Sequence, residues 1–280
     1  MSCLFVDHLT VIDCAYLDAD RGLVGESWIV DLELEGDLDA QSMVLDFGEV
    51  KRRIKRAIDD GPDHTLIVPE KAPGLRLETL ADGRIRLHFD SARGAITHVS
   101  PPIALTRLPV AAVSVDAVAT HLQAVLRATV PDSVQRIGLQ LRQEAIDGAH
   151  YHYVHGLKKH DGPCQRIAHG HRSRVEVRVD DARDPALEAD IAATWCDIYV
   201  GSREDVRQLG PDRVDFEYQA PEGQYALSLP ADHCLLIDHD STVECIADWL
   251  LADCASRRPG RAIEVRAFEG VRKGAVARQT

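Results

Sequence analysis

The sequence predicts an α+β protein made of two similar modules. Three observations support this prediction: several segments alternate polar and apolar residues, other segments carry an apolar helical face, and the second half repeats the order of the first. Alternation at every second residue is typical of a half-buried strand, whereas recurrence at every third or fourth residue is typical of a helix that covers a core. A chain of 280 residues with 45% hydrophobic content can build one large domain or two modest ones.

The first half opens with two expected strands. Residues 4–11 form the first strand and carry His8, and residues 28–34 form the second with clean alternation. Gly36 and Asp37 follow the second strand and indicate a turn. The chain therefore begins as a pair of strands before its first helix.

An amphipathic helix is expected after this turn. Its first residues fit a capping-box pattern, and three aliphatic residues recur at every fourth position on one face. The helix should end at Gly61-Pro62, and Asp63-His64 follow directly. The cap and face residues are Asp46, Glu49, Val50, Ile54 and Ile58. The later elements of this half are strands at 84–89 and 95–99, a helix at 114–128, and a strand at 137–142 that leads to Glu144.

The second half repeats this order of elements, which favours two modules over one large domain. His155 takes the place of His8 on an opening strand. We place the boundary near residue 148, which gives modules 1–148 and 149–280. No linker-like composition separates them, so we expect them to pack side by side. The matched segments are 94–101 with 223–230, 114–122 with 242–250, and 137–144 with 263–269, the last pair ending in Glu144 and Glu269.

A short segment of the second module carries candidate metal ligands. His169 and His171 lie two residues apart on an expected strand, so their imidazoles project from the same face. His155 precedes them on a segment that could form the neighbouring strand. Three imidazoles with a fourth position open are typical of a catalytic zinc site. Cys164 lies between these histidines and could be a fourth ligand, or a thiol whose thiolate the metal favours.

A simpler interpretation of the His-x-His pair is two surface histidines, because the chain contains 13 histidines. The coincidence of a third histidine, a cysteine and a strand pattern in one short window favours the metal site. Basic residues also gather in this window, and they could bind a small anion or simply flank a solvated strand edge. These residues are Lys158, Lys159, Arg166, Arg172 and Arg174.

Composition excludes some classes of function. A formal net charge of −13 argues against nucleic acid as the main partner, because binding phosphates needs a basic surface. The N-terminus lacks a basic region followed by an apolar run, and no stretch is long and apolar enough to span a bilayer, so we expect no membrane association. Seven cysteines without paired spacing are typical of reduced thiols in a cytoplasmic protein.

Taken together, these motifs resemble the 6-pyruvoyl-tetrahydropterin synthase and 6-carboxytetrahydropterin synthase family, which has the tunnelling fold, or T-fold. The resemblance rests on the histidine and cysteine set, on residues 43–47 followed by a helix and Asp63-His64, and on residues 241–244 opening a helix that leads to Glu269. It implies a tandem T-fold, with a four-stranded antiparallel sheet and two helices on one face in each module. Such sheets close into barrels across subunits, so the resemblance implies a homo-oligomer, either a dimer or a larger ring.

The motifs are unevenly divided between the modules. Val24-Gly25-Glu26 stand where the first module should carry its His-x-His pair, so module 1–148 is degenerate and module 149–280 carries the zinc site. In the second module, residues 210–213 (Gly-Pro-Asp-Arg) stand where the first has Gly61-Pro62-Asp63-His64. Active sites of this family resemble composites of two subunits. The resemblance therefore implies one composite site and one metal per chain.

The resemblance also implies a role for each candidate residue. The substrate would be 7,8-dihydroneopterin triphosphate, with Zn²⁺ as a Lewis acid, Cys164 as the base and Asp63-His64 as the proton relay. Asp232-His233 and Asp238-His239 are rivals for the relay, but both directly precede the second module's last helix, a less fitting place. The expected metal ligands are His155, His169 and His171, the pterin anchor is Glu269 or Glu144, and the triphosphate would bind Lys158, Lys159 and Arg166.

The function that these roles imply is a 6-carboxy-5,6,7,8-tetrahydropterin synthase-like lyase that makes the queuosine precursor. One alternative is 6-pyruvoyl-tetrahydropterin synthase-type elimination of triphosphate. A second alternative is a pterin-binding protein without catalysis, which would need neither a thiolate nor a proton relay. A zinc hydrolase would instead need a carboxylate base beside the metal.

Overall fold

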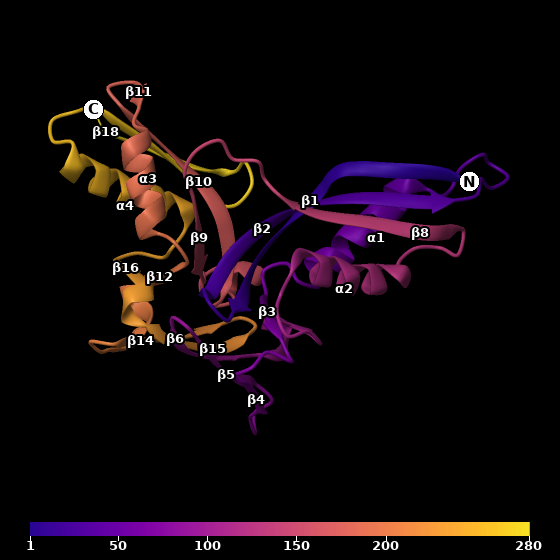
Figure 1. The fold of residues 1–280 in the computed structure, drawn as a ribbon, viewed down its shortest axis with the longest axis horizontal. Coiled ribbons are helices and arrows are strands. Elements are labelled where there is room, and N and C mark those ends of the chain that lie inside the picture. Colours follow the sequence, from indigo (N-terminus) through magenta and orange to yellow (C-terminus); the bar gives the residue numbers. More distant parts are fainter. Residues whose placement is uncertain (280) are drawn as a thin grey trace.

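The computed structural model describes residues 1–279. Within these residues the chain forms three β-sheets and four α-helices (Figure 1). The long N-terminal strands extend toward one end of the molecule, and the C-terminal strands lie near the other. None of the helices in this range is long and apolar enough to cross a membrane.

The first sheet is built by the first half of the chain, in the order β7-β3-β1-β2-β8. Strands β1, β2 and β8 are antiparallel, whereas β3 and β7 extend the sheet in parallel. Helices α1 (Phe47–Asp59) and α2 (Val115–Arg127) cover one face and share a core with the strands. The strand bounds are β1 (Ser2–Asp18), β2 (Gly22–Gly36), β3 (Leu66–Pro69), β7 (Leu105–Leu108) and β8 (Val134–Gln143).

The sequence pattern of α1 is confirmed. The Asp46 side chain caps the helix by accepting hydrogen bonds from the backbone N–H groups of Gly48 and Glu49. Three aliphatic residues, Val50, Ile54 and Ile58, are buried against the sheet. The helix ends at Asp59, directly before the turn that carries Asp63 and His64.

The second sheet is built by the second half, in the order β16-β12-β9-β10-β17-β18, with β11 paired to β10. Strands β9, β10, β17 and β18 are antiparallel, and β12 and β16 add in parallel. Helices α3 (Pro185–Thr194) and α4 (Val243–Arg257) share its core. The strand bounds are β9 (His150–His155), β10 (His169–Val179), β11 (Ala182–Arg183), β12 (Ile198–Ser202), β16 (Cys234–Ile237), β17 (Ile263–Phe268) and β18 (Gly274–Gln279).

The third sheet joins the two halves, in the order β13-β14-β15-β6-β5-β4. Strands β15 and β6 pair in antiparallel register, with Leu227 opposite His98. The core on this sheet contains residues from both halves, so the modules form one continuous body. The strand bounds are β4 (Leu75–Thr79), β5 (Ile85–Ser91), β6 (Gly94–Ser100), β13 (Val206–Leu209), β14 (Arg213–Ala220) and β15 (Gly223–Pro230).

The predicted α+β class, with two helices on the sheet of each module, is confirmed. The sheets themselves are larger than the expected four antiparallel strands and are mixed in direction. The difference comes from short parallel strands such as β3 and β12, which follow helices and are buried on both faces. Such strands lack the alternating pattern that marks a half-buried strand, so the sequence does not reveal them.

Strand register corrects the expected match between His8 and His155. Tyr16 lies opposite Val24 in the first sheet, just as His155 lies opposite His169 in the second. Tyr16 therefore occupies the repeat position of His155. The match to His8 is wrong because β1 continues to Asp18, beyond the expected end at residue 11, and the part of β1 that pairs as β9 does lies at its C-terminal end.

Register also corrects the expected counterpart of His64. Ala15 pairs with Leu66 as Val154 pairs with Tyr199, which places Asp197 at the repeat position of His64. Both residues adopt a left-handed backbone, with φ of 58° at Asp197 and 52° at His64. Residues 210–213 lie instead at the turn between β13 and β14, so their Gly-Pro-Asp motif is not equivalent.

Candidate metal and acid-base site

Three buried histidines meet where β9 pairs with β10. His155 lies opposite His169 in the antiparallel ladder, and His171 follows on the same face of β10. Each side chain is at most 1% exposed. Their ligand nitrogens lie within 4.8 Å of one another, and the Nε2 atoms of His155 and His171 are 3.1 Å apart. An ion among them would therefore meet three imidazole nitrogens.

The second ring nitrogen of two of these histidines faces a backbone carbonyl. His155 Nδ1 lies 2.8 Å from the carbonyl oxygen of Ser241, and His169 Nδ1 lies 3.1 Å from that of Arg166. Because a carbonyl only accepts hydrogen bonds, these contacts hold a proton on Nδ1 and leave Nε2 free to bind a metal. The donor set therefore fits a zinc ion with three protein ligands.

The charge state of the cluster also suits a metal. Burial and the neighbouring His171 hold the pKa of His155 well below its usual value, and burial and His155 do the same to the pKa of His169. Both rings are therefore neutral, which is the form that binds metal. His171 Nδ1 lies 3.2 Å from Asp13 Oδ1, although the two groups are not aligned as a hydrogen bond. Burial alone would raise the pKa of Asp13, but His171 and Lys273 outweigh it and keep this carboxylate ionised.

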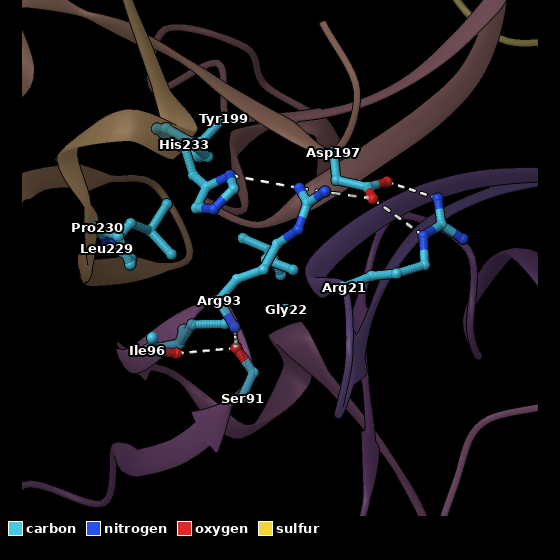
Figure 2. A pocket seen from close by; sticks show the side chains of 12 residues that line it. Arg21, Gly22, Ser91, Arg93, Ile96, Asp197, Tyr199, Leu229, Pro230 and His233 are labelled. Atoms are coloured by element: carbon cyan, nitrogen blue, oxygen red, sulfur yellow. Dashed lines mark hydrogen bonds and ion pairs between the residues drawn. The ribbon is translucent and has the colours of Figure 1, made fainter. Parts of the chain in front are cut away.

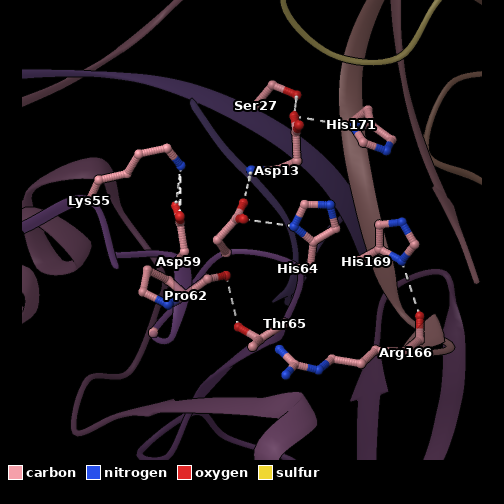
Figure 3. A network of polar contacts seen from close by, with 12 residues as sticks. Asp13, Ser27, Lys55, Asp59, Pro62, His64, Thr65, Arg166, His169 and His171 are labelled. Atoms are coloured by element: carbon pink, nitrogen blue, oxygen red, sulfur yellow. Dashed lines mark hydrogen bonds and ion pairs between the residues drawn. The ribbon is translucent and has the colours of Figure 1, made fainter. Parts of the chain in front are cut away.

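A proton-transfer pair from the first module reaches the same place. His64 forms a second group with Cys164 and His169, in which the ligand atoms also lie within 4.8 Å of one another. The His64 and His169 rings face each other with centroids 5.1 Å apart (Figure 3). Asp63 Oδ2 lies 2.8 Å from His64 Nδ1, and Asp63 Oδ1 accepts a hydrogen bond from the Asp13 N–H at 2.8 Å. One chain therefore brings residues of both modules into one site.

Asp63 and Cys164 set the charge of His64. Burial alone would lower the pKa of this imidazole, but hydrogen bonds from its ring to Asp63 and Cys164 raise it to about 10. The ring is therefore a cation beside the Cys164 sulfur near neutral pH.

The three cations expected to bind the triphosphate are already paired with carboxylates. Arg166 is only 5% exposed and donates two hydrogen bonds to Glu222, at 2.9 and 3.1 Å. Lys158 Nζ lies 2.5 Å from Asp205 Oδ1. Lys159 Nζ lies 2.8 Å from Asp240 Oδ2. None of the three is free to receive a phosphate in this conformation.

The two candidate anchors for the pterin have different surroundings. Glu269 Oε2 lies 3.8 Å from Lys273 Nζ, and this ammonium lies 3.2 Å from Asp13 Oδ2. Glu269 is therefore linked to the histidine cluster. Glu144 instead pairs with Arg174. Register corrects the expected equivalence as well, because the strand pairings place Gln143, and not Glu144, at the repeat position of Glu269.

The family follows from a comparison with known proteins. The family model described as 6-pyruvoyl tetrahydropterin synthase matches the chain twice, over residues 15–140 and 146–280. The chain belongs to the 6-pyruvoyl tetrahydropterin synthase family. It carries two copies of this family's domain, which confirms the tandem T-fold.

Solved structures of this family show partial similarity to the chain. A 6-pyruvoyl tetrahydropterin synthase from Plasmodium falciparum is 18% identical with a TM-score of 0.41, and it covers 50% of this chain and 90% of its own. One from Plasmodium vivax is 18% identical with a TM-score of 0.39, and it covers 50% of this chain and 97% of its own. A comparison with curated proteins found no match.

This tandem member of the 6-pyruvoyl tetrahydropterin synthase family contains a second, altered site at the repeat-related position. Where the copy with the histidine cluster has His64, the altered copy has Asp197, which is buried beside Arg21 from the short β1–β2 turn. Arg21 donates to both oxygens of Asp197, at 2.5 and 2.9 Å. Figure 2 shows Asp197 between Arg21 and Arg93, with His233 on the other side of Arg93. An ion pair therefore stands where the other copy has its cysteine and histidine.

The rival acid-base pairs lie elsewhere in the structure. His233 contacts Arg93 in the altered site at 3.5 Å, and Asp238 pairs with Arg203 at 2.9 Å. Neither pair belongs to a metal-ligand group among the described residues. Of the three Asp-His pairs considered for the relay, Asp63-His64 is the one that meets Cys164 and the histidine cluster.

Sequence reasoning missed Asp13, Lys273, Arg21 and Asp197. Asp13 offered a weak signal, because it is a charged residue within an otherwise apolar part of a strand. The Arg21–Asp197 pair joins residues far apart in the chain, so no local pattern could reveal it.

Proposed function

We propose that this chain is a zinc-dependent lyase that converts 7,8-dihydroneopterin triphosphate into 6-carboxy-5,6,7,8-tetrahydropterin. One observation carries the proposal: three imidazoles, a thiol and an Asp-His pair meet in one site. Membership of the 6-pyruvoyl tetrahydropterin synthase family supports a pterin substrate. The queuosine pathway is part of this proposal, as the destination of the carboxylated product.

In this proposal His155, His169 and His171 hold Zn²⁺, which would act as a Lewis acid toward the side-chain oxygens of the substrate. Cys164, as a thiolate, removes a proton from the adjacent side-chain carbon. His64 is a cation paired with Asp63, so it can donate a proton to an oxygen of the substrate and then regain it.

Binding of the pterin ring is assigned to Glu269. Its carboxylate is 23% exposed and lies on the side of the site where Lys273 and Asp13 approach the histidines. A carboxylate there can accept two hydrogen bonds from a pterin. We keep Glu144 as the alternative, although its pairing with Arg174 would have to break.

Pterin binding without catalysis is a second candidate function. It is favoured by the ion pairs of Lys158, Lys159 and Arg166, because carboxylates already occupy the three cations assigned to the triphosphate. For the lyase, these cations would have to exchange a carboxylate for a phosphate. This exchange is feasible for Lys159, whose side chain is 62% exposed, but costly for the buried Arg166.

One incubation distinguishes these functions. Zinc-loaded protein is mixed with 7,8-dihydroneopterin triphosphate, and triphosphate and acetaldehyde are measured. Release of both supports the carboxy-forming lyase, whereas triphosphate alone indicates 6-pyruvoyl-tetrahydropterin synthase-type elimination. Release of neither, with a pterin bound in equilibrium dialysis, would refute catalysis and support the binding protein. Cys164→Ala serves as the control for the assigned base.

We further propose that the chain acts as a homo-oligomer in the cytoplasm. Strands β8 and β18 are edge strands of their sheets, and pairing them with other copies would remove exposed edges. All seven cysteines are free, which is typical of a reducing compartment. Light scattering of the purified protein tests the assembly, and a monomer would contradict it.

A further inference from the structure

Asp13 connects both parts of the candidate site, although it belongs to the module without metal ligands. Its side chain is buried, and its Oδ1 atom accepts a hydrogen bond from Ser27 Oγ at 2.5 Å. The same Oδ1 lies 3.2 Å from Nδ1 of His171. Oδ2 lies 3.2 Å from the ammonium of Lys273. Figure 3 shows Asp13 between Ser27 and His171.

We infer that Asp13 is a positioning residue that orients His171 for metal binding from the opposite module. The inference rests on the histidine cluster assigned to zinc under the proposed function. A carboxylate beside the second nitrogen of a metal-binding histidine fixes the ring and raises its basicity. Because this carboxylate comes from the other module, metal affinity becomes dependent on how the two modules dock.

The backbone of Asp13 supports the same role. Its N–H donates to Asp63 Oδ1 at 2.8 Å, and its carbonyl accepts from the N–H of His64 at 2.7 Å. The side chain of Asp13 thus contacts a metal ligand, while its peptide groups hold the acid-base pair. Movement of this one residue would displace both.

The loop after β17 closes over the carboxylate. Gly270 has a φ of 69°, and a Cβ added there would lie 2.5 Å from Asp13 Oδ1 and 2.9 Å from Ser27 Oγ. Its N–H donates to Ser173 Oγ at 3.0 Å, which holds the loop against β10. Only glycine allows this approach, and the approach shields the Asp13–His171 contact from water.

The altered copy of the site provides a built-in comparison. Register places His152 at the repeat position of Asp13, and Glu26 at that of His171. His152 Nδ1 lies 2.6 Å from the carbonyl oxygen of Gly25, and His152 belongs to no metal-ligand group among residues 1–279. Asp13 and His152 are therefore equivalent positions, and the one that lies beside a histidine of the metal site, Asp13, carries a carboxylate.

The test is zinc affinity, measured by competition with a chromophoric chelator, for the wild type and Asp13→Asn. We expect about 10- to 100-fold weaker binding in the variant, the range found when such supporting groups are lost. The rise in Tm on adding zinc should shrink in parallel, because ligand stabilisation follows affinity. His152→Asn, the matched control, should bind zinc as the wild type does.

Equal zinc affinity in folded Asp13→Asn and the wild type would overturn the inference. If that variant does not fold, Ser27→Ala decides: a loss of a few-fold supports the inference, and unchanged affinity overturns it. The result is independent of the proposed reaction. A wild type that binds zinc but releases no triphosphate would refute the reaction and leave the role of Asp13 intact.

Discussion

His98 should make the protein sensitive to acid. This residue lies on β6 in the sheet that joins the two modules, is 1% exposed, and has no hydrogen-bond partner at Nδ1. Burial lowers its pKa from 6.5 to about 3. The folded state therefore holds a neutral ring at pH values where the unfolded chain binds a proton. This difference favours unfolding between pH 6.5 and about 3.

The magnitude follows from the shift in pKa. Each pH unit below 6.5 costs about 1.4 kcal/mol, so the loss at pH 5 is about 2 kcal/mol and approaches 5 kcal/mol near pH 3. This stability is present above pH 6.5 and is lost as the pH falls through the window. His98→Leu removes the titrating group and also the unpaired Nδ1, so it should stabilise the protein at neutral pH as well.

Urea unfolding of metal-free protein between pH 7.5 and 4, at fixed salt, measures this effect. Other buried histidines also titrate, so the relevant quantity is the difference between the wild type and His98→Leu at each pH. We expect this difference to widen by about 2 kcal/mol from pH 7 to pH 5. Parallel curves for the two proteins would show that His98 does not titrate as its burial requires.

The remaining predictions concern the site and its altered copy. Cys164→Ala should keep zinc but lose about 10²- to 10⁴-fold in kcat, as expected for a missing general base, and wild-type turnover would disprove that role. Arg21→Ala should lower the free energy of unfolding by roughly 2 kcal/mol, less than for a fully buried pair, because the Arg21 side chain is 37% exposed. Adding Asp197→Asn to this variant should restore part of the lost stability. An unaltered Cm in urea for Arg21→Ala would contradict the predicted loss. Elemental analysis should find one tightly bound zinc per chain, and two would show that the altered copy also binds metal.

The sequence predicts the parts of the site that lie close together along the chain. His155, His169 and His171 share one hairpin, so strand periodicity alone places their rings on one face. The approach of His64 to Cys164 was expected only from the family resemblance, because it depends on how two modules dock. Local patterns carry no information about such docking.

The errors have a physical origin in strand register. Motif matching pairs His8 with His155, but β1 continues to Asp18 and its C-terminal part pairs as β9 does, so Tyr16 is the true counterpart. Residues 14–17 lack polar and apolar alternation, so the pattern gives no sign that the strand continues there. The match of Glu144 to Glu269 is also an error of register, because pairing with β2 places Gln143 there.

In the tandem arrangement, one copy of the site can carry the groups suited to chemistry while the other copy stabilises the contact between modules. Two identical copies would each have to do both. The copy with the metal-ligand group buries three histidines, and two of them stay neutral, which weakens folding at low pH. The altered copy places Val24 where the other copy has His169, and adds the Arg21–Asp197 ion pair between modules. One copy can therefore hold the modules together while the other keeps groups suited to chemistry. If this division is correct, breaking the Arg21–Asp197 pair should lower stability and leave zinc affinity nearly unchanged, whereas Asp13→Asn should weaken zinc binding.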